Sequence, residues 1–164
     1  MGKSKKTAVY PGTFDPFTNG HVSLVKRGLD IFDEIVVGVA LHTPKTPLFS
    51  LEERVFMTSR SFNGDPRVKV EPFEGLLVDY VRRQKAGAIL RGMRAVADFE
   101  YEFQMALMNR RLDRSIQTVF LMTDYKWLYI SSTIIKDVAR LGGDIKGLVP
   151  PVVEKALYKK FGRL

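Results

Sequence analysis

Residues 7–21 read TAVYPGTFDPFTNGH. The short apolar run at Thr7–Tyr10 predicts a β-strand, and the prolines and glycines after it predict a stiff turn. From Val22 onward apolar residues recur at helical spacing, so a helix should follow the turn. His21 falls in the first turn of that helix, where free N–H groups and the helix dipole favour an anion. The segment therefore predicts a strand, a long loop and an anion-binding helix start.

Two common phosphate-binding loops do not match this segment. It lacks the Gly-Lys-Ser/Thr ending of a Walker loop and the three glycines of the dinucleotide-binding fingerprint. A purely structural interpretation is also open, in which His21 only caps the helix and Thr13 only forms the turn. The spacing of these residues in the sequence does not decide between the anion-binding and the structural interpretation.

The same order of strand and helix recurs along the chain. Further strands are expected at residues 34–41, 68–71, 88–90 and 118–122, and further helices at 51–60, 76–84, 99–112, 132–141 and from 151. Connections of this length predict a parallel sheet covered on both faces. We expect one α/β domain over residues 7–164, doubly wound and Rossmann-like with a five-stranded parallel sheet, after a flexible basic segment at 1–6. Its ligand should lie beyond the carboxyl ends of the strands.

Charge and composition restrict the classes of function. Lys and Arg number 26 against 18 Asp and Glu, a net charge of +8, which favours nucleic acid, a membrane surface or a phosphorylated small molecule as partner. With no cysteine and two histidines, the chain has no disulfide framework, thiolate nucleophile or zinc–cysteine site. The longest apolar run, 35–41, is far shorter than the roughly 20 residues of a membrane span, so we expect a cytoplasmic protein that does not bind membranes. No nucleic-acid motif appears, and a basic nucleic-acid-binding module stays only as the rival class.

Longer motifs point to a family. Thr18, Gly20 and His21 match the T/HxGH signature of the nucleotidyltransferase superfamily. Together with residues 10–16 (YPGTFDP), 91–102 (RGMRAVADFEYE) and 130–133 (ISST), the chain resembles the bacterial phosphopantetheine adenylyltransferases over nearly its whole length. The resemblance implies transfer of AMP from ATP to 4′-phosphopantetheine, giving dephospho-coenzyme A and pyrophosphate. The attacking phosphate is already anionic, so such a site must supply positioning and positive charge rather than an activated nucleophile.

The resemblance also implies roles for individual residues. The implied catalytic residues are Thr13, His21, Lys45, Arg91 and Arg94, with His21 on the α-phosphate and Thr13 between the two reacting phosphates. The implied ATP-binding residues are Thr13, Phe14, His21, Gly92, Met93, Arg94, Glu102, Trp127, Leu128, Tyr129, Ile130, Ser131, Ser132 and Thr133. The implied phosphopantetheine-binding residues are Thr13, Lys45, Leu76, Leu77 and Arg91. Arg91 also stands out without the family, because it directly follows a buried apolar run and needs an anion there.

Plainer interpretations exist for several of these residues. Lys45 is also explained as a solvated loop lysine, which is the usual fate of lysines. Arg94 has the spacing to pair with Asp98 instead of a phosphate. Residues 131–133 also suit an ordinary helix cap, and the pair Leu76-Leu77 suits a hydrophobic core. The alternative function is that of a related nucleotidyltransferase that uses another phosphorylated acceptor, such as nicotinamide mononucleotide or glycerol phosphate.

The helix expected at 99–112 is apolar nearly all round and must be covered on more than one side. The cover is either a deep core or a second copy of the chain, and the resemblance, which implies a homohexamer built as a dimer of trimers, favours the second. We expect Mg²⁺ to be held mainly through the substrate phosphates rather than at a metal site of the protein. The resemblance also suggests coenzyme A as a feedback ligand.

Overall fold

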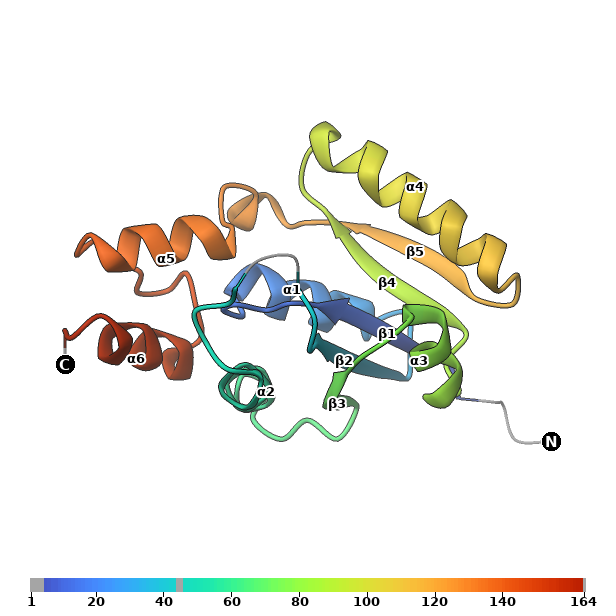
Figure 1. The fold of residues 1–164 in the computed structure, drawn as a ribbon, viewed down its shortest axis with the longest axis horizontal. Helices are drawn as coiled ribbons and strands as arrows, with labels where there is room; N and C mark the ends of the chain where they lie inside the picture. Colours follow the sequence, from blue (N-terminus) through green and yellow to red (C-terminus); the bar gives the residue numbers. More distant parts are fainter. Residues whose placement is uncertain (1–4, 44–45, 164) are drawn as a thin grey trace.

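Five parallel strands form one sheet in the order β3-β2-β1-β4-β5 (Figure 1). The computed structural model describes residues 5–43 and 46–163. The strands are β1 (Thr7–Gly12), β2 (Glu34–Ala40), β3 (Val68–Phe73), β4 (Ala88–Met93) and β5 (Gln117–Met122). The helices are α1 (Asn19–Gly28), α2 (Leu51–Arg60), α3 (Leu77–Arg83), α4 (Val96–Leu112), α5 (Ser132–Arg140) and α6 (Pro151–Lys160), with a short 3₁₀ turn η1 (Tyr125–Trp127). The predicted α/β Rossmann-like class with a five-stranded parallel sheet is confirmed.

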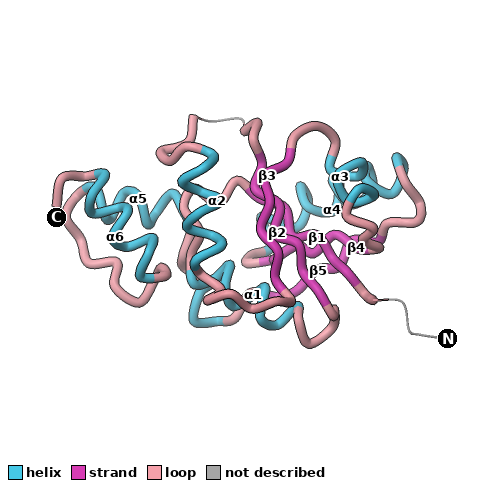
Figure 2. The backbone as a smooth tube through the Cα atoms, turned by 90° about the horizontal axis from the view of Figure 1, so that it is seen from below, coloured by secondary structure: helices cyan, strands magenta, loops and turns pink. Residues whose placement is uncertain are grey.

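Alternate side chains of the strands cover the two faces of the sheet. Val9, Val36 and Ile89 are paired across β1, β2 and β4, and they pack on one face with α3. Their neighbours, such as Ile35 and Leu90, pack on the other face with α1, α2, α5 and α6. Figure 2 shows these four helices on one side of the sheet and α3 and α4 on the other. Both faces are therefore buried, as continuous β-branched runs predict.

The strand order reverses beside β1. Val9 of β1 pairs with Val36 of β2 on one side and with Ile89 of β4 on the other. The loop that leaves β1 leads to a helix on one face of the sheet, whereas the loop that leaves β4 leads to α4 on the opposite face. A crevice opens between such diverging loops, and this is where ligands of doubly wound sheets bind.

Several element boundaries differ from the prediction, and two of the differences bear on the site. β4 continues past Leu90 to Met93, because Arg91 and Gly92 stay paired with Phe120 and Leu121 of β5. Arg91 therefore lies inside the strand rather than directly after it. α4 begins at Val96 rather than at residue 99, so Asp98 lies in its first turn, where a carboxylate suits the helix dipole.

Helix α4 is covered on only part of its circumference. The side chains of Phe99, Tyr101, Phe103, Leu107 and Met108 are between 46% and 63% exposed. The rings of Phe99 and Phe103 stack on each other at a centroid distance of 5.5 Å. This rules out the deep-core alternative within one chain, while self-association stays a prediction. None of the helices in the described part of the chain is long and apolar enough to pass through a membrane.

Candidate active site

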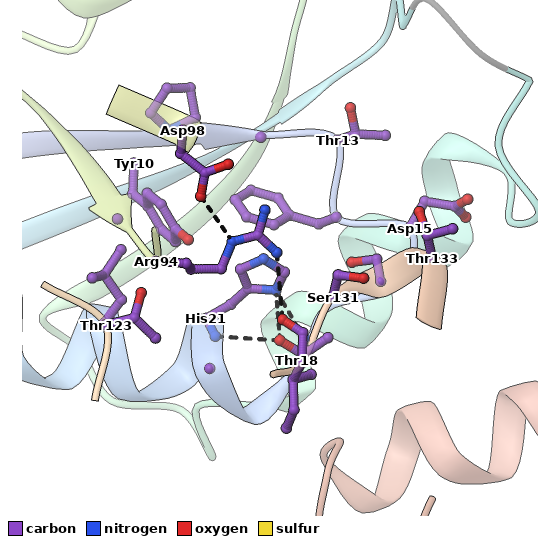
Figure 3. Close-up of a pocket in the computed structure, with 18 of the residues that line it drawn as sticks. Tyr10, Thr13, Asp15, Thr18, His21, Arg94, Asp98, Thr123, Ser131 and Thr133 are labelled. Carbon is purple, nitrogen blue, oxygen red and sulfur yellow. Dashed lines mark hydrogen bonds and ion pairs between the residues drawn. The ribbon is translucent and has the colours of Figure 1, made fainter. Parts of the chain in front are cut away.

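A pocket of about 590 Å³ lies at the carboxyl end of the sheet, where the loops after β1, β2, β4 and β5 meet (Figure 3). A second pocket of about 280 Å³ adjoins it. The two pockets share Pro11, Gly12, Thr13, Arg91 and Glu102. The site is therefore one cleft with a larger and a smaller lobe, and Thr13 and Arg91 lie at their junction.

The start of α1 holds His21 in the larger lobe. The backbone N–H of Thr18 donates to Nδ1 of His21 at 2.9 Å, and the backbone N–H of His21 donates to the Thr18 hydroxyl at 3.4 Å. This reciprocal pair is a capping box with histidine in the third helical position. Because Nδ1 accepts a hydrogen bond, the neutral ring carries its proton on Nε2. The capping role foreseen for His21 is real, and it fixes the tautomer of the ring.

The surroundings of His21 keep the ring uncharged. Burial, together with the positive charges of Arg94 and Arg91, lowers the pKa of His21 from its ordinary 6.5 to about 3. Figure 3 shows Arg94 lying between Asp98 and the His21 ring. The rings of Phe14 and Phe17 lie 5.2 and 5.1 Å from the imidazole and form its apolar wall. His21 is thus a neutral hydrogen-bond donor at physiological pH and not an imidazolium acid.

The loop after β1 has a left-handed residue that is not glycine. Phe14 has a φ of 51° and is nearly fully buried. A β-carbon at Gly12 would approach the Phe14 ring to 2.6 Å, so residue 12 must lack a side chain for the ring to fit. A strained conformation of this kind persists where the surrounding packing holds it, commonly at functional sites. The loop that includes Thr13 is therefore rigidly placed.

Arg91 connects the two lobes. Its Nε donates to Glu102 at 2.8 Å, its Nη2 donates to the other oxygen of the same carboxylate, and its Nη1 donates to the carbonyl of Pro11 at 3.0 Å. A guanidinium has five N–H groups, and these three contacts leave two of them for a ligand. The ion pair and the strand together hold Arg91 in place before an anion arrives.

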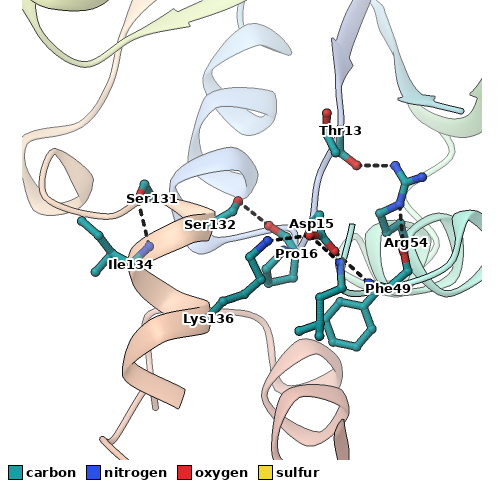
Figure 4. A network of polar contacts seen from close by, with 10 residues as sticks. Thr13, Asp15, Pro16, Phe49, Arg54, Ser131, Ser132, Ile134 and Lys136 are labelled. Carbon is teal, nitrogen blue, oxygen red and sulfur yellow. Dashed lines mark hydrogen bonds and ion pairs between the residues drawn. The ribbon is translucent and has the colours of Figure 1, made fainter. Parts of the chain in front are cut away.

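Two more basic side chains line the larger lobe. Arg94 lies 3.4 Å from Asp98, so the pairing left open by the sequence is present in the structure. Lys136 of α5 lies 2.6 Å from Asp15, which also accepts the backbone N–H groups of Leu48 and Phe49 (Figure 4). Arg91, Arg94 and Lys136 thus each contact a carboxylate from a separate acidic residue. These cations are fixed in position while the lobe gains little net charge.

The start of α5 contributes hydroxyl groups. Ser131 caps the helix by accepting the backbone N–H of Ile134 at 3.1 Å, and the Ser132 hydroxyl donates to the carbonyl of Pro16 at 2.7 Å. Thr133 lines the pocket beside them. Free N–H groups and a positive dipole end are found at a helix start, and both suit a phosphate. The predicted cap and the predicted anion-binding position therefore coincide.

Most residues named from the sequence line the cleft, and some do not. The larger lobe is lined by Thr13, Phe14, His21, Arg91, Gly92, Arg94, Glu102, Trp127, Ile130, Ser131, Ser132 and Thr133. Leu77 lines the smaller lobe, whereas Leu76, Met93, Leu128 and Tyr129 line neither lobe. Leu76 and Tyr129 are 57% and 65% exposed. Lys45 lies outside the described residues.

The sequence analysis missed Asp15 and Lys136, which both line the larger lobe. A weak signal for Lys136 existed, because it follows Ser132 by four residues and so shares its helix face. Asp15 belongs to the motif at residues 10–16 that supports the family resemblance, but no role was predicted for its side chain. Its role depends on partners 33 to 121 residues away, which no local pattern contains.

Comparisons with known proteins agree with this geometry. Residues 9–138 match the Cytidylyltransferase-like family model. Two curated proteins named phosphopantetheine adenylyltransferase, from Oleidesulfovibrio alaskensis and Nitratidesulfovibrio vulgaris, are 68% and 67% identical to the chain. Each alignment covers 96% of this chain, and they cover 92% and 84% of the respective relatives. A solved structure titled as a putative nicotinate-nucleotide adenylyltransferase from Vibrio parahaemolyticus superposes with a TM-score of 0.70 at 18% identity, covering 98% of this chain and 96% of that one. The last of these shows a shared fold.

Proposed function

The chain belongs to the phosphopantetheine adenylyltransferase family, and we propose that its reaction takes place in the two-lobed cleft at the carboxyl ends of the strands. The enzyme transfers AMP from ATP to 4′-phosphopantetheine in coenzyme A synthesis, releasing pyrophosphate. The observation that carries the placement is the junction of the lobes, where Thr13 and Arg91 serve both volumes. Two phosphorylated substrates must meet at one such point.

The difference between the lobes supports an assignment of the two substrates. The smaller lobe has apolar walls from Phe73, Leu77, Met105 and Ala106, which suit the largely aliphatic pantetheine arm. The larger lobe is lined by the His21 ring, paired cations and the start of α5, which suit a triphosphate. With the arm in the smaller lobe, its phosphate lies at Arg91. Leu76 and Lys45 stay as predicted ligands, on the resemblance alone.

The mechanism needs positioning more than proton transfer. An oxygen of the pantetheine phosphate forms a bond to the α-phosphorus of ATP, and the bond from that phosphorus to the bridging oxygen of pyrophosphate breaks. Both phosphates are already ionised, so no side chain has to remove a proton first. The Nε2–H of His21 donates to an α-phosphate oxygen as charge builds there, which lowers the barrier without a change of protonation. Lys136 and the hydroxyls of 131–133 are placed to hold the leaving pyrophosphate.

We further propose Mg²⁺ as the cofactor, carried by the ATP phosphates. Asp15, Asp98 and Glu102, the acidic residues that line the larger lobe, each already contact a cation of the protein. In the described ranges no three or more acidic, histidine or cysteine side chains are grouped so that they could hold a metal. Mg²⁺ usually keeps several waters and relies on substrate phosphates, which agrees with this donor set. When bound, the ion neutralises charge on the polyphosphate.

The oligomeric state is part of the same proposal. The exposed apolar side chains of α4 support self-association, and the family resemblance alone implies that the assembly is a homohexamer, a dimer of trimers. Coenzyme A as a feedback ligand follows from the resemblance, and the cytoplasmic location follows from the sequence. Neither rests on the geometry of the cleft.

The test is an acceptor comparison. The purified protein is incubated with ATP, Mg²⁺ and 4′-phosphopantetheine, with nicotinamide mononucleotide as the acceptor in a parallel reaction, and pyrophosphate and the adenylylated product are measured. We expect dephospho-coenzyme A from the first reaction only. Product from nicotinamide mononucleotide instead would keep nucleotidyl transfer and overturn the acceptor, and no product from either would refute the proposal.

A further inference from the structure

Arg54 of α2 is a buried arginine beneath the site, with only 2% of its surface exposed. Its Nη1 donates to the carbonyls of Thr13 at 2.7 Å and Ala40 at 2.9 Å, and its Nε donates to the carbonyl of Phe49 at 3.3 Å. These carbonyls belong to the loop after β1, the end of β2 and the segment before α2. Figure 4 shows the guanidinium reaching the Thr13 and Phe49 segments.

The contacts explain why a charge is tolerated there. A buried cation is costly unless its N–H groups find acceptors, and Arg54 finds them in backbone carbonyls rather than in an acid. Ala40 is the last residue of β2 and Thr13 follows the last residue of β1, so both acceptors lie at the carboxyl end of the sheet. Among the residues that the structure describes, no carboxylate forms an ion pair with Arg54. The planar fork of a guanidinium suits acceptors on several segments at once.

Phe49 is held by a second charged side chain, that of Asp15, in addition to Arg54. The N–H of Phe49 donates to the Asp15 carboxylate at 3.0 Å, while the carbonyl of Phe49 accepts from Arg54. The peptide segment before α2 is thus held by two charged side chains of opposite sign, Asp15 from the loop that includes Thr13 and Arg54 from α2. The position of Thr13 depends on this connection, because the carbonyl of Thr13 is itself an acceptor of Arg54.

We propose that Arg54 is a positioning residue for adenylyl transfer, which holds Thr13 at the junction of the two lobes and adds a buried positive charge behind it. The inference rests on the proposed function, because it assigns Thr13 to the meeting point of the substrates. The three cations that line the larger lobe are each opposed by a carboxylate in contact with them, whereas Arg54 is not. The nearby carboxylates of Asp15 and Glu52 offset part of this charge, so the main contribution of Arg54 is the position of Thr13.

The test compares two variants of α2. Arg54→Lys keeps a charge but replaces the planar guanidinium, which donates from two nitrogens, by a single ammonium nitrogen. Thr58→Val is the control, one helical turn further on, where a buried hydroxyl has no partner among the described residues. Steady-state rates are measured well below each variant's unfolding temperature and divided by the folded fraction. We expect kcat of Arg54→Lys to fall by about 100-fold, the loss typical of reacting groups displaced by about 1 Å, with KM for ATP changing much less. The control should stay near the original rate.

A second measurement, hydrogen–deuterium exchange, does not depend on enzymatic activity. Hydrogen–deuterium exchange at residues 12–18 should be faster in Arg54→Lys than in the unaltered protein or Thr58→Val. If Arg54→Lys does not fold, Arg54→Ala with added guanidinium ion takes its place, and the ion should restore both the rate and the protection.

The possible results separate the two ideas. An unaltered protein without activity refutes the proposed function, and the exchange data alone then decide the role of Arg54. Unchanged kcat per folded molecule and unchanged exchange in Arg54→Lys would overturn the positioning role. Failure of both Arg54 variants to fold would also overturn it, because Arg54 would then be a requirement of the fold alone.

Discussion

The state of His21 yields a prediction that separates a neutral donor from an acid. Its Nδ1 accepts the Thr18 N–H, and burial with two nearby arginines lowers its pKa to about 3. Only the Nε2–H is then left to act on the substrate. Replacement by alanine removes that donor, whereas replacement by glutamine returns an N–H at a similar reach. Glutamine is also an accepted residue at the third position of a capping box, so the start of α1 is kept.

The expected losses follow from one hydrogen bond in a water-poor site. His21→Ala should lower kcat by roughly 100- to 1000-fold, the effect of removing one donor to a developing oxyanion. His21→Gln should lose only about tenfold, equivalent to about 1.4 kcal/mol, because its amide is more flexible than the ring. The KM for ATP should change little in both, since the contact strengthens mainly in the transition state. His42→Ala is the matched control, because His42 is exposed and lines neither lobe.

The pH profile is the second half of the assay. A group with a pKa near 3 in the free protein does not titrate between about pH 5 and 8, so kcat/KM, which reports the free enzyme, should show no inflection from His21 there. Because the folded pKa is depressed, His21 contributes stability above its ordinary pKa of 6.5 that is lost as the pH falls toward 3. His21→Gln should remove that part of the acid sensitivity in thermal unfolding. An inflection in kcat/KM near neutral pH that disappears in His21→Gln, with glutamine as inactive as alanine, would refute the neutral-donor mechanism.

Three further outcomes are expected. Arg91→Lys keeps the charge but cannot hold Glu102 and a phosphate together, so KM for phosphopantetheine should rise about tenfold with a smaller change for ATP; equal changes for both substrates in steady-state kinetics would contradict the assignment. Lys136→Met should weaken inhibition by pyrophosphate about tenfold, and an unaltered inhibition constant would remove Lys136 from the leaving-group site. Leu107→Glu on the exposed part of α4 should give a smaller species in sedimentation velocity, whereas an unaltered chain that is monomeric at micromolar concentration would contradict the oligomer.

The sequence predicted the elements well and their ends less well. Apolar runs and helical spacing placed all five strands and six helices, because both faces of the sheet are buried and the signal is continuous. The misplaced end of β4 has a tertiary cause. Arg91 and Gly92 do not look like strand residues, and only pairing with β5 keeps them in the sheet. The turn η1 was also missed, and its Asp124 cap acts over two residues only.

The candidate site likewise has residues that local sequence motifs predicted and contacts that depend on tertiary packing. Motif residues could be named because the resemblance is local in sequence, and Thr13, His21 and 131–133 do meet in one lobe. Spacing also indicated one local pair, Arg94 with Asp98, whereas other partners that hold the site together lie farther apart in the chain than any local pattern reaches. The Arg91–Glu102 pair spans 11 residues and the Thr13–Arg54 contact spans 41, so each depends on how β1, β4, α2 and α4 pack.

The pairing of cations with carboxylates in the site has a physical reason in the chemistry of its substrates. Two polyanionic substrates require cations, yet unpaired cations in a cleft would repel one another and move. The structure resolves the conflict by placing a carboxylate against Arg91, Arg94 and Lys136, so each cation is held before substrate arrives. Phosphate binding then shares these pairs and needs little rearrangement, which favours the transition state over loose ground-state binding. The acids of the site are therefore as necessary to the positioning as the bases, although a search for phosphate ligands in the sequence selects the bases.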